Sequence, residues 1–218
     1  MERLGTQTEL MSKTTSPSKP QTRIQKRNIM VILDAALEVF STYGFRGTTL
    51  DQIARQAGLS KPNVLYYFDS KEAIHLALLS QLLETWLDPL RAIDPQGDPK
   101  TELMRYIGHK LQMSRDFPRE SRLFANEIVQ GAPRMQAFLQ GDLRDLVDEK
   151  AAVIQAWMKD GKLTQLDPFH LIFSIWALTQ HYADFEAQIR LVRGSNIEQP
   201  HDGSEDFLGQ VFQKLLTP

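Results

Sequence analysis

Residues 48–68 have the sequence TTLDQIARQAGLSKPNVLYYF, which is typical of two short helices joined by a tight turn. The apolar residues of the first helix recur at helical spacing and are Leu50, Ile53, Ala54 and Ala57. Gly58 gives the turn the backbone freedom it needs. Ser60 is a favourable N-cap for the second helix, and Pro62 lies in its first turn, where a missing N–H costs nothing.

The second helix has a polar side that suits insertion into the major groove of DNA. Lys61, Asn63, Tyr66 and Tyr67 form this side, whereas Val64, Leu65 and Phe68 are expected to face inward. Lysine and asparagine are side chains that read base edges, and a short amphipathic helix fits the groove. We expect phosphate contacts from Thr48, Thr49, Ser60, Lys71 and basic residues of the N-terminal tail.

The residues around this motif resemble the N-terminal domain of TetR-family repressors over about fifty positions. The matching blocks are Ala35-Ala36-Leu37, Tyr43-Gly44-Phe45, Gly47-Thr48-Thr49, Ala57-Gly58-Leu59-Ser60 and Leu65-Tyr66-Tyr67-Phe68, followed by Ser70-Lys71-Glu72. The Tyr-Tyr-Phe ending and the Ser-Lys-Glu after it are the more specific part, because many helical hairpins contain a glycine turn. The resemblance implies a homodimeric, ligand-responsive regulator that binds a near-palindromic operator in double-stranded DNA.

Composition fits a soluble globular protein with a basic end. The 218 residues include no cysteine, so disulfides and thiolate metal sites are excluded. Residues 11–68 carry eight Lys and Arg against three acids, a local charge of +5, although the whole chain has −2. No apolar run approaches the ~20 residues of a membrane span, and the N-terminus lacks a signal-peptide core. We therefore expect a cytoplasmic protein that contacts phosphates at one end and no membrane.

The periodicity predicts an all-α fold of about nine helices and no strand. We expect a flexible basic tail at 1–21, a helix-turn-helix domain at 22–69, and a ligand-binding and dimerisation domain at 70–218. The predicted helices span about 22–43, 50–57, 61–68, 71–91, 103–117, 121–130, 135–160, 167–192 and 205–216. The helix at 167–192 and the last helix are the expected dimer surface, where family members form a four-helix bundle.

A second group of residues predicts a small-molecule site in the C-terminal domain. Trp176 and Gln180 share one face of a helix, with Phe173 one turn earlier, and Trp86 lies on the helix that leaves the DNA-binding domain. Two indoles and an amide suit a flat, uncharged heterocycle. Asn126 and Glu127 of a neighbouring helix are further candidates for this site.

The C-terminal half also resembles the pyrimidine-utilisation regulators of the family, through residues 82–90, 121–124, 131–133 and 170–185. This resemblance implies control by uracil or thymine, and it assigns ligand contacts to Trp86, Trp176 and Gln180. The residues before Thr22 and after Val192 do not share it.

Two other functions remain open from the sequence. A regulator of the same fold could respond to apolar drugs or acyl groups, and the sequence does not exclude a broad pocket. A pyrimidine-acting enzyme is disfavoured, because no nucleophile–base pair, metal set or nucleotide loop is evident. His170 and His181 are too far apart along one helix to share an ion. We expect no catalytic residues, no metal and no cofactor.

Overall fold

The computed structural model describes residues 22–218, and within them the predicted all-α fold is confirmed, with helices and no strand. The predicted tail at 1–21 lies outside the described residues. The helices are α1 (Arg23–Gly47), α2 (Leu50–Gln56), α3 (Lys61–Tyr67), α4 (Lys71–Arg91), α5 (Pro99–Asp116), α6 (Pro118–Val129), α7 (Gln136–Phe138), α8 (Arg144–Lys159), α9 (Pro168–Asp184), α10 (Glu186–Arg193) and α11 (Ser204–Leu216). A π-helical segment (Leu139–Leu143) joins α7 to α8, and a 3-10 turn (Gly194–Asn196) follows α10.

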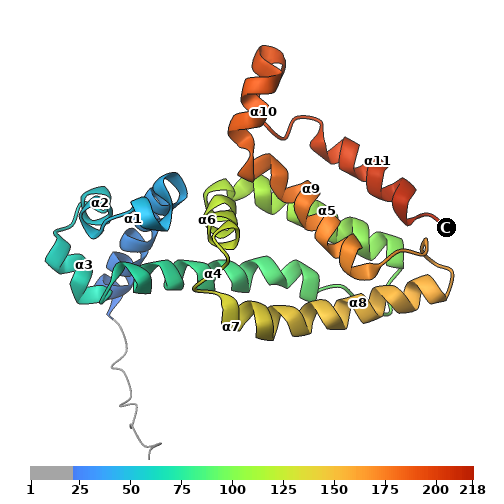
Figure 1. The fold of residues 1–218 in the computed structure, drawn as a ribbon, viewed down its shortest axis with the longest axis horizontal. Helices are drawn as coiled ribbons and strands as arrows, with labels where there is room; N and C mark the ends of the chain where they lie inside the picture. Colours follow the sequence, from blue (N-terminus) through green and yellow to red (C-terminus); the bar gives the residue numbers. More distant parts are fainter. Residues whose placement is uncertain (1–21) are drawn as a thin grey trace, which may run out of the picture.

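The number of helices differs from nine because two long predicted helices are each broken. The helix expected at 135–160 is split by the π-helical segment, where Gly141 leaves the helical backbone region. The helix expected at 167–192 ends at Asp184, and α10 begins after Phe185 and projects from the body of the molecule (Figure 1). Both predictions of a single continuous helix were wrong.

Helices α1 to α3 form the N-terminal domain, and side-chain caps begin each of them. The side chains of Thr22, Thr49 and Ser60 accept hydrogen bonds from backbone N–H groups in the first turns of α1, α2 and α3. Gly44 interrupts α1 with φ 66°, a conformation that favours glycine, so the predicted helix end at this residue is confirmed. By length and mean hydropathy α1 could cross a membrane, but its apolar face packs in this domain's core.

Helix α4 belongs to both halves of the molecule. Its first half, including Ile74 and Leu79, packs with the α1–α3 core, whereas Leu87 and Leu90 pack with α5, α8, α9 and α11. Figure 1 shows α4 running from the end of α3 into the C-terminal domain. A change in the direction of α4 would therefore alter the packing of both the N-terminal and the C-terminal domain.

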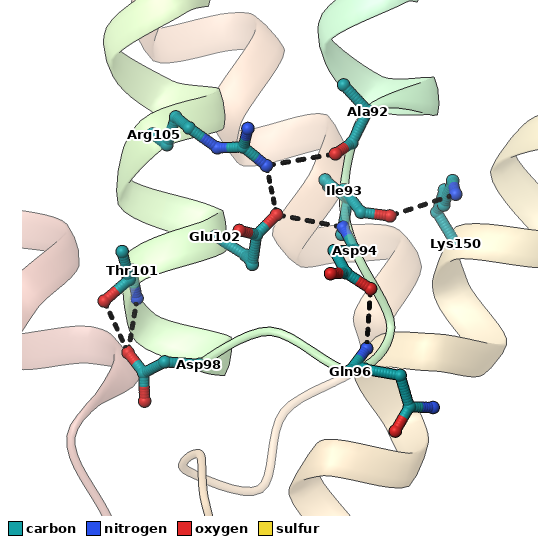
Figure 2. Close-up of polar contacts among 9 residues, drawn as sticks. All are labelled: Ala92, Ile93, Asp94, Gln96, Asp98, Thr101, Glu102, Arg105 and Lys150. Carbon is teal, nitrogen blue, oxygen red and sulfur yellow. Dashed lines mark hydrogen bonds and ion pairs between the residues drawn. The ribbon is translucent and has the colours of Figure 1, made fainter.

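The turn between α4 and α5 is held by polar side chains (Figure 2). Glu102 accepts a hydrogen bond from the Asp94 backbone N–H at 2.9 Å and pairs with Arg105, which also donates to the Ala92 carbonyl. The Lys150 ammonium donates to the Ile93 carbonyl at 3.3 Å from the α8 side. These contacts fix the direction in which α5 returns beside α4.

Candidate DNA interface and effector site

Helix α3 presents Lys61, Asn63 and Tyr66 to solvent. Tyr66 is 72% exposed, which is unusual for a tyrosine without a binding partner. The Lys61 ammonium pairs with Asp51 of α2 at 2.9 Å, and both side chains are exposed. Such a pair contributes little stability, so Lys61 is available to a stronger anionic partner. Leu65 is 38% exposed, which corrects the expectation that it faces inward.

Tyr67 is half-buried, and its position is set by α1. Its hydroxyl accepts a hydrogen bond from the Asn28 side-chain amide at 2.8 Å. The Tyr67 ring lies edge-on to Tyr66, with ring centroids 5.0 Å apart. Helix α1 therefore holds the C-terminal end of α3 through Tyr67.

Two of the expected phosphate contacts have internal roles. Thr48 is 1% exposed and its hydroxyl donates to the Gly44 carbonyl at 2.8 Å, which corrects the prediction that this side chain faces DNA. The Lys71 ammonium donates to the carbonyls of Phe45 and Thr48 at 2.8 and 2.7 Å. One of its three N–H groups is therefore left to donate to another acceptor, such as a phosphate. Thr49 and Ser60 are exposed helix caps. The exposed basic residues of this domain are Arg23, Lys26, Arg27, Arg46, Arg55 and Lys61.

Trp86 lies in the interior of the C-terminal domain and is 6% exposed. The Lys110 ammonium of α5 lies 4.5 Å from the centroid of its ring, and the Phe124 ring of α6 lies 6.0 Å away. Trp86 also lines a groove of about 270 Å³ between α1, α4 and α6, whose walls include Leu37, Leu78 and Leu123.

Trp176 is fixed by a hydrogen bond rather than by aromatic packing alone. Its Nε1 donates to the Tyr106 hydroxyl of α5 at 2.7 Å. Gln180, one turn further along α9, is half-buried and has no hydrogen-bond partner among the described residues. Phe173 is 47% exposed, with its ring 5.6 Å from that of Trp176. Trp86 and Trp176 thus meet the same helix, α5, through Lys110 and Tyr106.

Glu127 and Asn126 do not lie with this group. Glu127 is buried, and its carboxylate accepts from the Arg134 backbone N–H at 2.8 Å and from its guanidinium at 2.9 Å. Arg134 in turn stacks on Phe45 of α1, 3.3 Å from the ring centroid. Asn126 is exposed. The structure therefore corrects the prediction that these two residues belong to the small-molecule site. Glu127 joins the two domains, and Asn126 lies on the surface.

Three polar residues were not predicted as site residues: Tyr106 and Lys110, which contact the indoles, and Asp184, which lies two turns beyond Trp176 on α9. Burial lowers the pKa of Lys110 to about 8, and nearby Asp184 opposes this shift. Burial raises the pKa of Asp184, against the opposing effects of its hydrogen bond from Ser121 and of Arg122 and Lys110. The part of the chain that the structure describes has no group of His, Asp or Glu arranged to hold a metal ion.

Comparison with known families assigns both halves of the chain. Residues 32–78 match the family "bacterial regulatory proteins, tetR family", and residues 79–217 match "YcdC-like protein, C-terminal region", a TetR C-terminal family. The chain belongs to the TetR family of bacterial transcriptional regulators. This TetR-family chain is 50% identical over 184 residues to the HTH-type transcriptional regulator RutR of Escherichia coli K12, covering 84% of each protein.

Solved structures of proteins described as regulators have the same fold. A transcriptional regulator from Streptomyces coelicolor aligns with a TM-score of 0.64 and 25% identity, over 86% of this chain and 97% of that one. A fatty acid metabolism regulator from Clostridium perfringens aligns with a TM-score of 0.65 and 20% identity, over 86% and 99%, which shows the fold alone. The TetR-family chain is a DNA-binding regulator and not an enzyme.

Proposed function

We propose that this regulator senses uracil or thymine and, as a cytoplasmic homodimer, controls genes of pyrimidine catabolism through a palindromic operator. The observation that carries the effector assignment is the Lys110 ammonium, which lies buried against the Trp86 ring without an anionic partner among the described residues. The buried Lys110 ammonium and the oxygen of Asp184 that Ser121 does not contact suit a ligand with its own hydrogen-bonding groups, because an unpaired buried charge is costly. The resemblance of residues 82–90 and 170–185 to pyrimidine-utilisation regulators supports the same assignment.

On this proposal the effector lies between Trp86 and Trp176 with Gln180 in its plane. The Gln180 amide offers one donor and one acceptor to the alternating N–H and C=O groups of the ring. Lys61, Asn63, Tyr66 and Tyr67 would face the operator, with Thr49, Ser60 and Lys71 near phosphates. One recognition helix spans only a few base pairs, so specificity requires two copies about one helical turn apart.

Calorimetric titration tests the effector. Wild-type protein is expected to bind uracil or thymine, and Gln180→Leu to lose about tenfold or more in affinity because both amide partners disappear. Trp176→Phe keeps an aromatic face and is expected to lose less. The exposed α10 variant Gln188→Leu is the matched control. A site built for apolar ligands would bind a fluorescent apolar dye better in Gln180→Leu, and that result would reject the pyrimidine assignment.

Selection from a random pool of DNA duplexes tests the operator. The wild-type protein is expected to retain near-palindromic sequences, and Lys61→Ala and Asn63→Ala to weaken binding to them by roughly 1–3 kcal/mol each. Uracil affinity should not change in these two variants. Unaltered operator affinity in both would remove α3 as the reading helix.

A further inference from the structure

Lys110 is a buried cation without an anionic or hydrogen-bonding partner among the described residues. Its side chain is 5% exposed, and its ammonium faces the Trp86 ring at 4.5 Å. A cation–π contact stabilises such a group only partly, and burial of an unpaired ammonium is strongly unfavourable. The other buried lysine, Lys150, differs because it has both a carbonyl and a carboxylate within 3.3 Å.

Asp184 is the nearest source of negative charge, but it is not paired with Lys110. Its electrostatic effect on Lys110 is favourable, yet no nitrogen–oxygen distance between them is within 4.0 Å. One carboxylate oxygen of Asp184 accepts from the Ser121 hydroxyl at 2.5 Å. The other oxygen has no hydrogen-bond partner among residues 22–218. At the contact between α5 and α9, the Lys110 ammonium on α5 is therefore a hydrogen-bond donor without a partner, and one Asp184 oxygen on α9 is an acceptor without a partner, among the described residues.

Lys110 and Asp184 lie on the same helix faces as the residues already described at the α5–α9 contact. Trp176, Gln180 and Asp184 are spaced four residues apart on α9, and Tyr106 and Lys110 have the same spacing on α5. The Tyr106–Trp176 hydrogen bond fixes the register between the helices, and α5 and α9 start at the same end of the domain (Figure 1). Lys110 therefore lies one turn beyond Tyr106, and Asp184 two turns beyond Trp176, in the same direction.

We infer that Lys110 and Asp184 form the polar end of the effector site, where Lys110 donates to a ring carbonyl and Asp184 accepts from an adjacent ring N–H. This inference rests on the proposed effector function and makes its chemistry more specific. The ligand class is an uncharged planar ring in which a C=O lies next to an N–H, a cyclic amide or imide. A ligand without hydrogen-bonding groups would leave the Lys110 ammonium and one oxygen of the half-buried Asp184 carboxylate without a partner.

The inference predicts an unusual pair of effects for Lys110→Met, which keeps the unbranched stem and removes the charge. Uracil affinity should fall about tenfold or more, because a charged hydrogen bond is lost. The midpoint of thermal unfolding without ligand should stay the same or rise, because an unpaired buried cation is removed. A lysine with a purely structural role would give a lower midpoint. Lys159→Met, on the exposed end of α8, is the matched control.

The acceptor is tested with methylated rings. Wild-type protein should bind either 1-methyluracil or 3-methyluracil at least tenfold more weakly than uracil, because one N–H faces Asp184. Asp184→Ala should lose that discrimination, and the exposed control Asp160→Ala should keep it. Operator binding without effector reports that each variant is folded.

The outcomes separate this inference from the proposed function. Uracil affinity of Lys110→Met equal to that of the wild type would overturn the inference and leave the pyrimidine effector in place. Wild-type binding of hydantoin or succinimide but not of uracil or thymine, with loss in Lys110→Met, would reject the pyrimidine and support the inference. Wild-type protein that binds none of these rings would reject both.

Discussion

His75 is a titratable residue in the core that α1 shares with α4. It is 2% exposed, and its ring lies edge-on to Phe40 and Phe45 at centroid distances of 4.8 and 5.0 Å. Burial lowers its pKa from 6.5 to about 4, with Arg134 and Lys71 acting in the same direction and Glu127 opposing them. The folded protein therefore holds His75 neutral at pH values where the unfolded chain binds a proton.

Acid should destabilise the protein through this residue. Because the unfolded-state pKa is the higher one, stability is lost as the pH falls from about 6.5 towards 4. From this shift we expect His75 to contribute a loss of about 2 kcal/mol in the free energy of unfolding between pH 7 and pH 5. Urea titrations at the two pH values measure this loss, which should be about 2 kcal/mol smaller in His75→Leu than in the wild type. The exposed His109→Gln should behave like the wild type, and equal pH dependence in His75→Leu would contradict the assignment.

Two glycines should respond to alanine with opposite signs. Gly44 has φ 66°, where an L side chain is strained although no atom lies within 4 Å of its Cβ position. Gly44→Ala should lower the free energy of unfolding by about 1 kcal/mol or more. Gly108 lies on the exposed side of α5 with open space around it, so Gly108→Ala should raise stability by about 0.5–1 kcal/mol. Urea unfolding of both variants checks this, and changes of the same sign would refute it.

Among the elements, α6 connects the effector domain to the DNA-binding domain as directly as α4 does. Arg119 at its start pairs with Asp34 and Glu38 of α1 at 3.2 and 3.1 Å. Glu127 near its end holds Arg134 against Phe45. The same helix carries Ser121, which contacts Asp184. A displacement of α6 by an effector would therefore reach α1 as well as α4.

Coupling between the sites should depend on this contact. The double variant Arg134→Met/Glu127→Gln removes the link without leaving a buried carboxylate unpaired. The ratio of operator affinities with and without saturating uracil should fall about threefold or more, while uracil affinity alone changes little. Reciprocity requires the same reduction in the effect of operator on uracil affinity. Arg190→Met on α10 is the control, and an unaltered ratio in the double variant would exclude α6 from the coupling.

The elements show which parts of the structure the sequence could predict. Local signals predicted the helix-turn-helix well, because its caps and turn do not depend on the rest of the fold. Thr49 and Ser60 are the N-caps of α2 and α3, and Gly58 forms the turn between them. The break between α9 and α10 has no glycine or proline, and Asp184 is held there by Ser121 of another helix. Lys110 was missed for a similar reason. A lysine in a helix is usually exposed, and its burial depends on how α4 and α9 pack against α5.

At the scale of the whole molecule, the described chain has an apolar surface that suits a second copy. Phe169 and Phe173 are exposed on α9, and Phe207 and Leu215 are exposed on α11. On each helix these residues recur at spacings of four or eight, so they form a stripe on one face. A twofold interface uses such a face twice, and four helices from two copies can pack as a bundle.

Phe207→Glu should therefore separate the proposed dimer and weaken operator binding. Loss of one buried phenylalanine in each copy costs about 2 kcal/mol twice, so the dimer dissociation constant should rise about a thousandfold. Sedimentation velocity at several protein concentrations measures this directly. Affinity for a palindromic operator should fall with it, whereas affinity for a single half-site should not, because α3 is unaffected. Gln213→Glu adds the same charge on the opposite side of α11 and should leave the protein dimeric. A dimeric Phe207→Glu variant with full operator affinity would show that α11 lies outside the dimer contact.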